Sequence, residues 1–158
     1  MLQIGRAGTD DIEPIQHLLL NQFDEHGISV AHESMRQAIG ELLKDPRKGM
    51  CLVARESGQI VGLAVISLAW TLEHGGKSAW LDELYVLPEC RGRGVGRALL
   101  GQAVTAAREL GCAAIDLEVD RAHSRAERLY AREGFQSLPR SRWVKYLNRI
   151  VQGERKLE

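Results

Sequence analysis

The chain has 158 residues, of which 44% are hydrophobic and 27% are charged, a composition typical of a soluble globular domain with one core. Its 21 lysines and arginines balance its 21 aspartates and glutamates, so no overall field draws it to nucleic acid or to an anionic membrane. Three cysteines without metal-ligand spacing indicate reduced thiols and a cytoplasmic location. No segment reads as a signal peptide or a membrane span.

The first half of the chain predicts a strand, two helices and a hairpin. The first helix begins with acidic residues and carries an apolar face that includes Ile15 and Leu18. The turn Glu56-Ser57-Gly58 joins the two hairpin strands. The expected ranges are 2–7 for the strand, about 10–25 and 32–43 for the helices, and 49–55 and 59–70 for the hairpin.

The centre of the sequence predicts a strand over 80–87, a glycine-rich loop and a helix. Pro88 cannot donate to a sheet, so the strand ends there. Apolar residues then recur at helical spacing from Val95 to Leu110. Between these elements, three glycines free the backbone to direct N–H groups at one point, where a helix N-terminus adds its dipole. Arginines add cationic donors, so the loop is a candidate phosphate site that consists of Arg91, Gly92, Arg93, Gly94, Gly96 and Arg97.

The glycine spacing excludes two common phosphate-binding loops. Counting from Gly92, the third glycine of a dinucleotide fingerprint would fall on Arg97. No Gly-Lys-Ser/Thr follows, as a Walker loop requires. A glycine-rich turn with solvated arginines is the simpler alternative, but the strand before the loop and the helix after it favour phosphate binding.

The last third of the chain predicts a strand over 113–119, a short helix and two final strands. Ser124-x-x-Glu127 is a capping box that opens the helix, and Gly134 ends it. The final strands are expected over 135–137 and 142–150, followed by a charged, frayed tail. No linker or repeat interrupts the series, so we expect one domain over 1–158.

Two motifs in this sequence are more specific than the rest. The first is Arg91-x-x-Gly94-x-Gly96, preceded by Leu84-Tyr85-Val86-x-Pro88. The second is His123-x-x-Ala126-x-x-Leu129-Tyr130-x-x-x-Gly134-Phe135. At these motifs the sequence resembles the GNAT superfamily of N-acetyltransferases over roughly 81–135, with one departure, because His123 stands where asparagine is usual.

The resemblance implies an α/β fold: a mixed, mostly antiparallel sheet of about six to seven strands, with helices on both faces and a V-shaped splay at the cofactor site. It implies acetyl-CoA as co-substrate, no metal, and a homodimer. The pantetheine arm would hydrogen-bond the backbone of Leu84 and Val86 as if adding a strand. The pyrophosphate would meet the loop of Arg91 to Arg97, with His123 as a further cofactor contact. Arg121 and Arg125 are expected on a solvated helix surface.

The chemistry of such a transfer requires a neutral amine. Freeing the lone pair of an alkyl ammonium at pH 7 costs about 4 to 5 kcal/mol, so a carboxylate that takes the proton is needed. Glu83 is the preferred base and Asp82 the second candidate, although neighbouring strand residues face opposite ways unless a bulge intervenes. Glu118 and Asp120 are further acids that would replace or assist them. By resemblance, Tyr130 is the general acid that protonates the departing thiolate.

The acceptor is open on the sequence alone. A polyamine, an aminoglycoside, an amino acid, a xenobiotic amine and a protein amine all fit, and likeness to spermidine/spermine acetyltransferases is loose. Two alternatives lie outside catalysis: a regulatory module that binds acyl-CoA without turnover, and a nucleotide-binding structural domain. The glycine spacing argues against the second.

Overall fold

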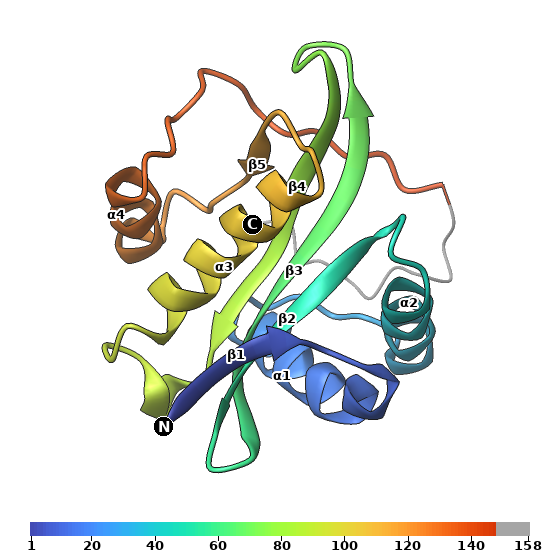
Figure 1. Cartoon of the computed structure of the whole chain (residues 1–158), viewed down its shortest axis with the longest axis vertical. Coiled ribbons are helices and arrows are strands. Elements are labelled where there is room, and N and C mark those ends of the chain that lie inside the picture. Colours follow the sequence, from blue (N-terminus) through green and yellow to red (C-terminus); the bar gives the residue numbers. More distant parts are fainter. Residues whose placement is uncertain (148–158) are drawn as a thin grey trace.

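Periodic patterns in the sequence translate closely into elements in the computed structural model, which describes residues 1–147 (Figure 1). The second helix and the hairpin occur where they are expected, while the central strand begins earlier, at Gly76. The first helix is preceded by one 3-10 turn, η1 (Thr9–Asp11), and a second turn, η2 (Pro88–Cys90), follows the central strand. The remaining elements are β1 (Leu2–Arg6), α1 (Ile12–Glu25), α2 (His32–Lys44), β2 (Gly49–Glu56), β3 (Gln59–Thr71), β4 (Gly76–Val86), α3 (Val95–Glu109), β5 (Ile115–Leu117) and α4 (Ser124–Arg132).

The strands form one sheet in the order β1-β2-β3-β4-β5. Neighbouring strands are antiparallel except β4 and β5, which are parallel. Helices α1 and α2 pack on one face of the sheet and α3 on the other (Figure 1). The predicted architecture, a mixed and mostly antiparallel sheet between helices, is therefore confirmed.

Two hydrophobic clusters lie on opposite faces of the sheet because strand side chains alternate between them. On β3, Ala64 and Ile66 pack in the cluster that contains α3, whereas Leu63 and Val65 pack in the cluster that contains α1 and α2. The helices contribute side chains with almost no exposed surface, including Ile15, Leu99 and Leu100. Burial on both faces makes β3 the central support of the fold.

The two final strands predicted near the C-terminus do not form in the residues described. Residues 135–147 are neither strand nor helix, and 148–150 lie outside the described residues. Pro139 lacks a backbone donor, and Arg140 binds the Glu73 carboxylate at 2.9 Å through both oxygens. The segment is held by side-chain contacts of this kind and not by backbone hydrogen bonds to a neighbouring strand. Within residues 1–147 the sheet thus has five strands rather than six to seven.

Strand β5 is shorter than expected and accompanies only part of β4. Its residues Ile115–Leu117 run parallel to Ala79, Trp80 and Leu81. Beyond Leu81, β4 continues to Val86 with no strand on that edge among residues 1–147. The pairing of the two parallel strands therefore ends halfway along β4, at the position where the family resemblance implies a splay.

Candidate active site

A β-bulge in β4 decides which way the two candidate bases point. Val65 pairs with Glu83, but the next residue of β3, Ile66, pairs with Leu81, so Asp82 is an extra residue on β4. Glu83 consequently shares the sheet face of Val65, which packs with α1 and α2. The sequence required a bulge here if the two acids were to act together, and the structure contains one.

The Glu83 carboxyl lies in a desolvated and negatively charged setting. Its pKa is raised to about 7, chiefly by burial and further by the charges of Asp82 and Glu118, while the Gln22 side chain on α1 acts to lower it. A base with a pKa near neutrality is substantially ionised at pH 7 and still holds a proton well. Glu83 thus has the proton affinity that general-base chemistry needs.

The other acidic candidates have more solvated or more neutralised environments. Asp82 is exposed, and partial desolvation raises its pKa above the usual value, although Ser67 and Arg142 act to lower it. Glu118 forms an ion pair with Arg142 at 2.9 Å. Asp120 accepts a hydrogen bond from the Ala122 N–H at 3.0 Å. These contacts make Glu83 the stronger candidate base.

Helix α4 places Tyr130 where the charge of Glu83 acts on its hydroxyl. The ring packs edge-on against Phe135, with centroids 5.8 Å apart, and borders the cluster that contains α3. Burial raises the pKa of the Tyr130 hydroxyl, and the Glu83 charge raises it further. The hydroxyl therefore keeps its proton at neutral pH and is available as a donor.

The open edge of β4 carries the backbone groups of Leu84 and Val86. Leu87 donates its N–H to the Val61 carbonyl at 2.9 Å, so Leu87 and Tyr85 direct their backbone groups toward β3. Backbone groups alternate between the two edges of a strand, so Leu84 and Val86 direct theirs away from β3. The Val86 carbonyl accepts a hydrogen bond from Arg91 Nε at 2.8 Å, which leaves the Val86 N–H and the Leu84 groups on this edge.

The loop before α3 has the backbone shape that the sequence predicts. Gly92 and Gly94 have φ angles of 77° and 83°, in the left-handed region that favours glycine, and Gly94 caps α3. Gly96 lies beside β4, because a Cβ there would be in ordinary van der Waals contact with a methyl group of Val86, at 3.7 Å. The first turn of α3 is thus held against β4, with its unpaired N–H groups beside the open edge.

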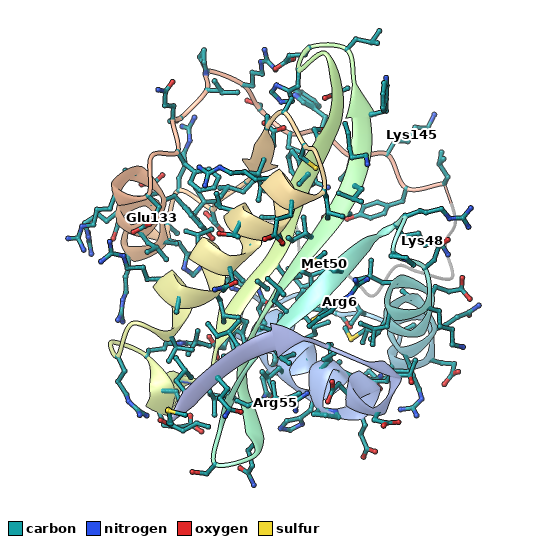
Figure 2. All side chains as sticks on the ribbon, in the orientation of Figure 1. Arg6, Lys48, Met50, Arg55, Glu133 and Lys145 are labelled. Carbon is teal, nitrogen blue, oxygen red and sulfur yellow. The ribbon has the colours of Figure 1, made fainter. Side chains whose placement is uncertain are left out.

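Each of the three predicted loop arginines is bound to a carboxylate distant in sequence. Arg91 Nη2 contacts both Glu25 oxygens at 3.0 and 2.9 Å, and the guanidinium lies 5.3 Å from the Tyr85 ring centre. Two further ion pairs complete the set. These are Arg93 with Glu56 at 2.5 Å, and Arg97 with Glu133 at 2.7 Å, the latter carboxylate being labelled beside α4 in Figure 2.

Two exposed residues near the loop have contacts that the sequence does not indicate. Arg125 lies on the solvated surface of α4, as expected, and it also lies beside the loop, because a Cβ on Gly92 would be 3.6 Å from its Nη2. His123 Nε2 lies 3.1 Å from His26 Nδ1 at the end of α1. No local motif in the sequence indicates this contact, which joins two exposed residues 97 positions apart.

Cavity size does not identify the site. A cavity of about 730 Å³ lies between α1 and the β2–β3 hairpin, lined by residues that include Glu25, Arg55 and Tyr85. Glu83 and Tyr130 do not line it. None of the helices within residues 1–147 is long and apolar enough to cross a membrane.

Comparisons with known proteins agree with this geometry. A family model described as the acetyltransferase (GNAT) family matches residues 12–135. The mycothiol acetyltransferase of Propionibacterium freudenreichii subsp. shermanii is 34% identical over 129 residues, which cover 80% of this chain and 39% of that protein. The aminoalkylphosphonate N-acetyltransferase of Salmonella typhimurium is 28% identical over 137 residues, 84% of each protein.

A solved structure also shares the fold. An aminoglycoside N-acetyltransferase in complex with CoA has a TM-score of 0.80 at 16% identity, over 94% of this chain and 96% of that one. The family match spans most of the chain, from α1 through the glycine loop to Phe135. The chain therefore belongs to the GNAT family of acetyltransferases and is an acyltransferase.

Proposed function

We propose that the protein transfers an acetyl group from acetyl-CoA directly to a primary amine, with Glu83 as general base and Tyr130 as general acid. The observation that carries the proposal is the position of Glu83: a desolvated carboxyl with a pKa of about 7, near Tyr130 at the unpaired end of β4. A carboxylate that can accept a proton from the amine and a phenol that can donate one to the thiolate are the two groups that this transfer requires.

The residues around this edge fit acetyl-CoA. The amides at Gly92, Gly94 and Gly96 suit the pyrophosphate, and the backbone of Leu84 and Val86 suits the pantetheine arm. When bound, acetyl-CoA supplies the activated acetyl group. The structure of the aminoglycoside enzyme with CoA supports this use of the fold. Arg91, Arg93, Arg97, Arg125 and His123 complete the proposed cofactor contacts.

The proposed proton transfers balance without a further reactant. Glu83 takes one proton from the acceptor ammonium, and the freed nitrogen forms the amide bond as the thioester C–S bond breaks. Tyr130 gives its proton to the departing thiolate and is restored by the second proton that the nitrogen loses. The products are the N-acetylated amine, CoA as free thiol, and one proton that Glu83 releases to water.

The acceptor class, assembly and location are also proposals. The names of the relatives, a mycothiol acetyltransferase and an aminoalkylphosphonate acetyltransferase, support an amine-bearing small molecule as acceptor. A peptide amine is the other acceptor class. A homodimer is supported by exposed Trp70, Leu72 and Trp143 side chains, because such apolar groups are typical of contact surfaces. Three free cysteines support the reducing cytoplasm.

The test is thiol release from acetyl-CoA in the presence of aminoalkylphosphonates, polyamines, aminoglycosides, amino acids and lysine peptides. We expect amine-dependent release that falls at least 100-fold in Tyr130→Phe, while calorimetry shows unchanged CoA binding. Tight CoA binding without turnover on any amine would instead indicate a regulatory acyl-CoA module. Failure to bind CoA would overturn the proposal for the glycine loop.

A further inference from the structure

A guanidinium from the segment after α4 lies over the central strand. The Arg142 guanidinium is 5.5 Å from the centre of the Trp80 ring, which is within the range of a cation–π contact. Its Nη1 also contacts Oε1 of Glu118 at 2.9 Å. Figure 1 shows this segment crossing the upper part of the sheet. An aromatic face and a carboxylate, the two groups that commonly recognise cationic ligands, therefore hold one positive charge here.

Trp80 lies on the same face of the sheet as the candidate base Glu83. Leu81 packs in the cluster that contains α3, so its neighbour Trp80 faces the other side of the sheet, where α1 and α2 pack. The strand register agrees, because Trp80 pairs with Ser67 and Glu83 pairs with Val65, two residues away on β3. The two side chains are thus neighbours on one face, about 7 Å apart along the strand.

Weak contacts hold Arg142 on this face. Its side chain is 61% exposed and that of Glu118 is 53% exposed, so water competes for both charges. A cation–π contact at an exposed position is also weak. Residues 135–147 are neither helix nor strand, so no ladder of backbone hydrogen bonds fixes the arginine in place. A ligand cation that reaches Trp80 and Glu118 can therefore replace it at little cost.

We propose that Trp80 and Glu118 form a subsite for a second cation of the acceptor, and that Arg142 occupies this subsite until the acceptor displaces it. The acceptor is then a small molecule with two cationic groups, such as a diamine. One nitrogen reacts beside Glu83, and the other binds over Trp80, about 7 Å away along the strand. An anionic group in that place would be repelled by the Glu118 carboxylate. This inference rests on the proposed transfer to an amine with Glu83 as base.

The direct test compares two amines of similar length that differ in the second charge. Diaminopentane and pentylamine are titrated into the protein without acetyl-CoA. Proton–nitrogen correlation NMR follows the indole N–H signal of Trp80, which Trp80→Phe assigns. We expect a saturable shift of this signal, with diaminopentane binding about tenfold more tightly than pentylamine because both of its ends are held. Equal affinity for the two amines would overturn the inference.

Removing the arginine should help the diamine. Arg142→Ala vacates the subsite, so diaminopentane should bind about two- to fivefold more tightly, and in turnover its KM should fall while kcat is unchanged. Arg140→Ala is the matched control, because Arg140 lies on the same segment and is 64% exposed but pairs with Glu73 at 2.9 Å. Weaker diamine binding in Arg142→Ala, or the same change in both variants, would show that the arginine only anchors the segment and would contradict the inference.

The carboxylate is tested in the absence of the competing arginine. Glu118→Gln keeps the shape of an exposed side chain, so it leaves the fold intact even if a substitution at Trp80 does not. Added to Arg142→Ala, it should weaken diaminopentane binding about two- to fivefold, because the ammonium loses its ion pair. Unchanged binding in the double variant would show that Glu118 is not part of a cation subsite.

The inference and the proposed function fail separately. If diaminopentane binds with this dependence on Arg142 and Glu118 but releases no thiol from acetyl-CoA, the subsite is supported and the proposed transfer is wrong. If pentylamine is acetylated as efficiently as diaminopentane, the transfer is supported and the subsite is wrong. Loss of aminoalkylphosphonate binding in Arg142→Ala would assign the arginine to an anionic group of the acceptor and would also overturn the inference.

Discussion

The glycine loop and the surroundings of Glu83 differ in whether their charged side chains have partners of opposite charge. Around the loop, Arg91, Arg93 and Arg97 each have a carboxylate partner. Around Glu83, the charged neighbours within residues 1–147 are acids. The loop is a neutralised and rigid support, while the base is held in an unfavourable environment that raises its proton affinity. Binding a cofactor and moving a proton therefore impose different electrostatic demands on adjoining parts of one fold.

Removal of the Glu83 charge is the most direct test of this difference and should have the largest effect. We expect Glu83→Gln to lower kcat/KM for the amine at pH 7 by at least about 100-fold, the usual scale of a general base. Wild-type activity should rise with pH through about 7, where Glu83 loses its proton. Asp82→Asn, one position away on the exposed bulge residue, is the control and should cost far less. Equal losses in both variants would refute the assignment of Glu83.

The same substitution should stabilise the fold at alkaline pH. Glu83 ionises near pH 7 in the folded state but near its ordinary 4.5 in the unfolded chain, so the unfolded state loses its proton first. The contribution of Glu83 to stability accordingly falls as pH rises from about 4.5 to 7. We expect Glu83→Gln to gain about 2 to 3 kcal/mol in unfolding free energy between pH 4 and pH 8 relative to wild type. Urea unfolding at both pH values measures this difference, and parallel curves would disprove it.

Replacing two glycines by alanine, one in the loop and one inside α3, should change the stability of the protein in opposite directions. Gly94 has a φ of 83°, so Gly94→Ala should destabilise the protein by about 1 to 2 kcal/mol and weaken CoA binding about tenfold or more. Gly101, inside α3, has open space around it, and Gly101→Ala should stabilise by up to about 1 kcal/mol. Thermal unfolding and calorimetry test both. Destabilisation of similar size at the two positions would be inconsistent with strain confined to the loop.

Removing the carboxylate partner of Arg91 should have the smallest effect of these substitutions. Partial burial raises the pKa of Glu25, but hydrogen bonds from Tyr85 and Arg91 outweigh it and hold that pKa below its usual value. Because the pair is partly solvated, Glu25→Gln should cost less than about 1 kcal/mol, a loss that disappears as pH falls through the lowered pKa of Glu25. Arg91 is then free for phosphate, so CoA binding at low salt should strengthen about two- to threefold. Weaker binding would mean that Glu25 is needed to hold Arg91 in place.

Local patterns were sufficient to predict what lies close in sequence. The helix over 32–43, the hairpin turn at 56–58 and the loop before α3 follow from periodicity, glycine and capping residues. The two motifs were sufficient to predict the fold family. Glu83 and Tyr130 were named from chemistry together with the family resemblance, and their roles stay predictions; in the structure the charge of Glu83 acts on the Tyr130 hydroxyl.

Contacts between distant segments were not predictable. The partners of Arg91 and Arg93 lie 66 and 37 residues away, and nothing in the local sequence marks them. The final strands were expected because residues 142–147 are rich in aromatic and branched side chains, but Trp143 is 91% exposed and gains no burial from a sheet. The bulge at Asp82 was foreseen only as a condition, since strand register depends on the partner strand.

The bulge also gives β4 one residue more than the part of β3 beside it. Leu81 and Glu83 pair with the adjacent residues Ile66 and Val65, so deleting Asp82 would remove the bulge and leave Glu83 on the face that it now occupies. A bulge bends its strand and increases the local twist. Loss of this one codon would therefore change the course of β4 and not the side of the sheet on which Glu83 lies.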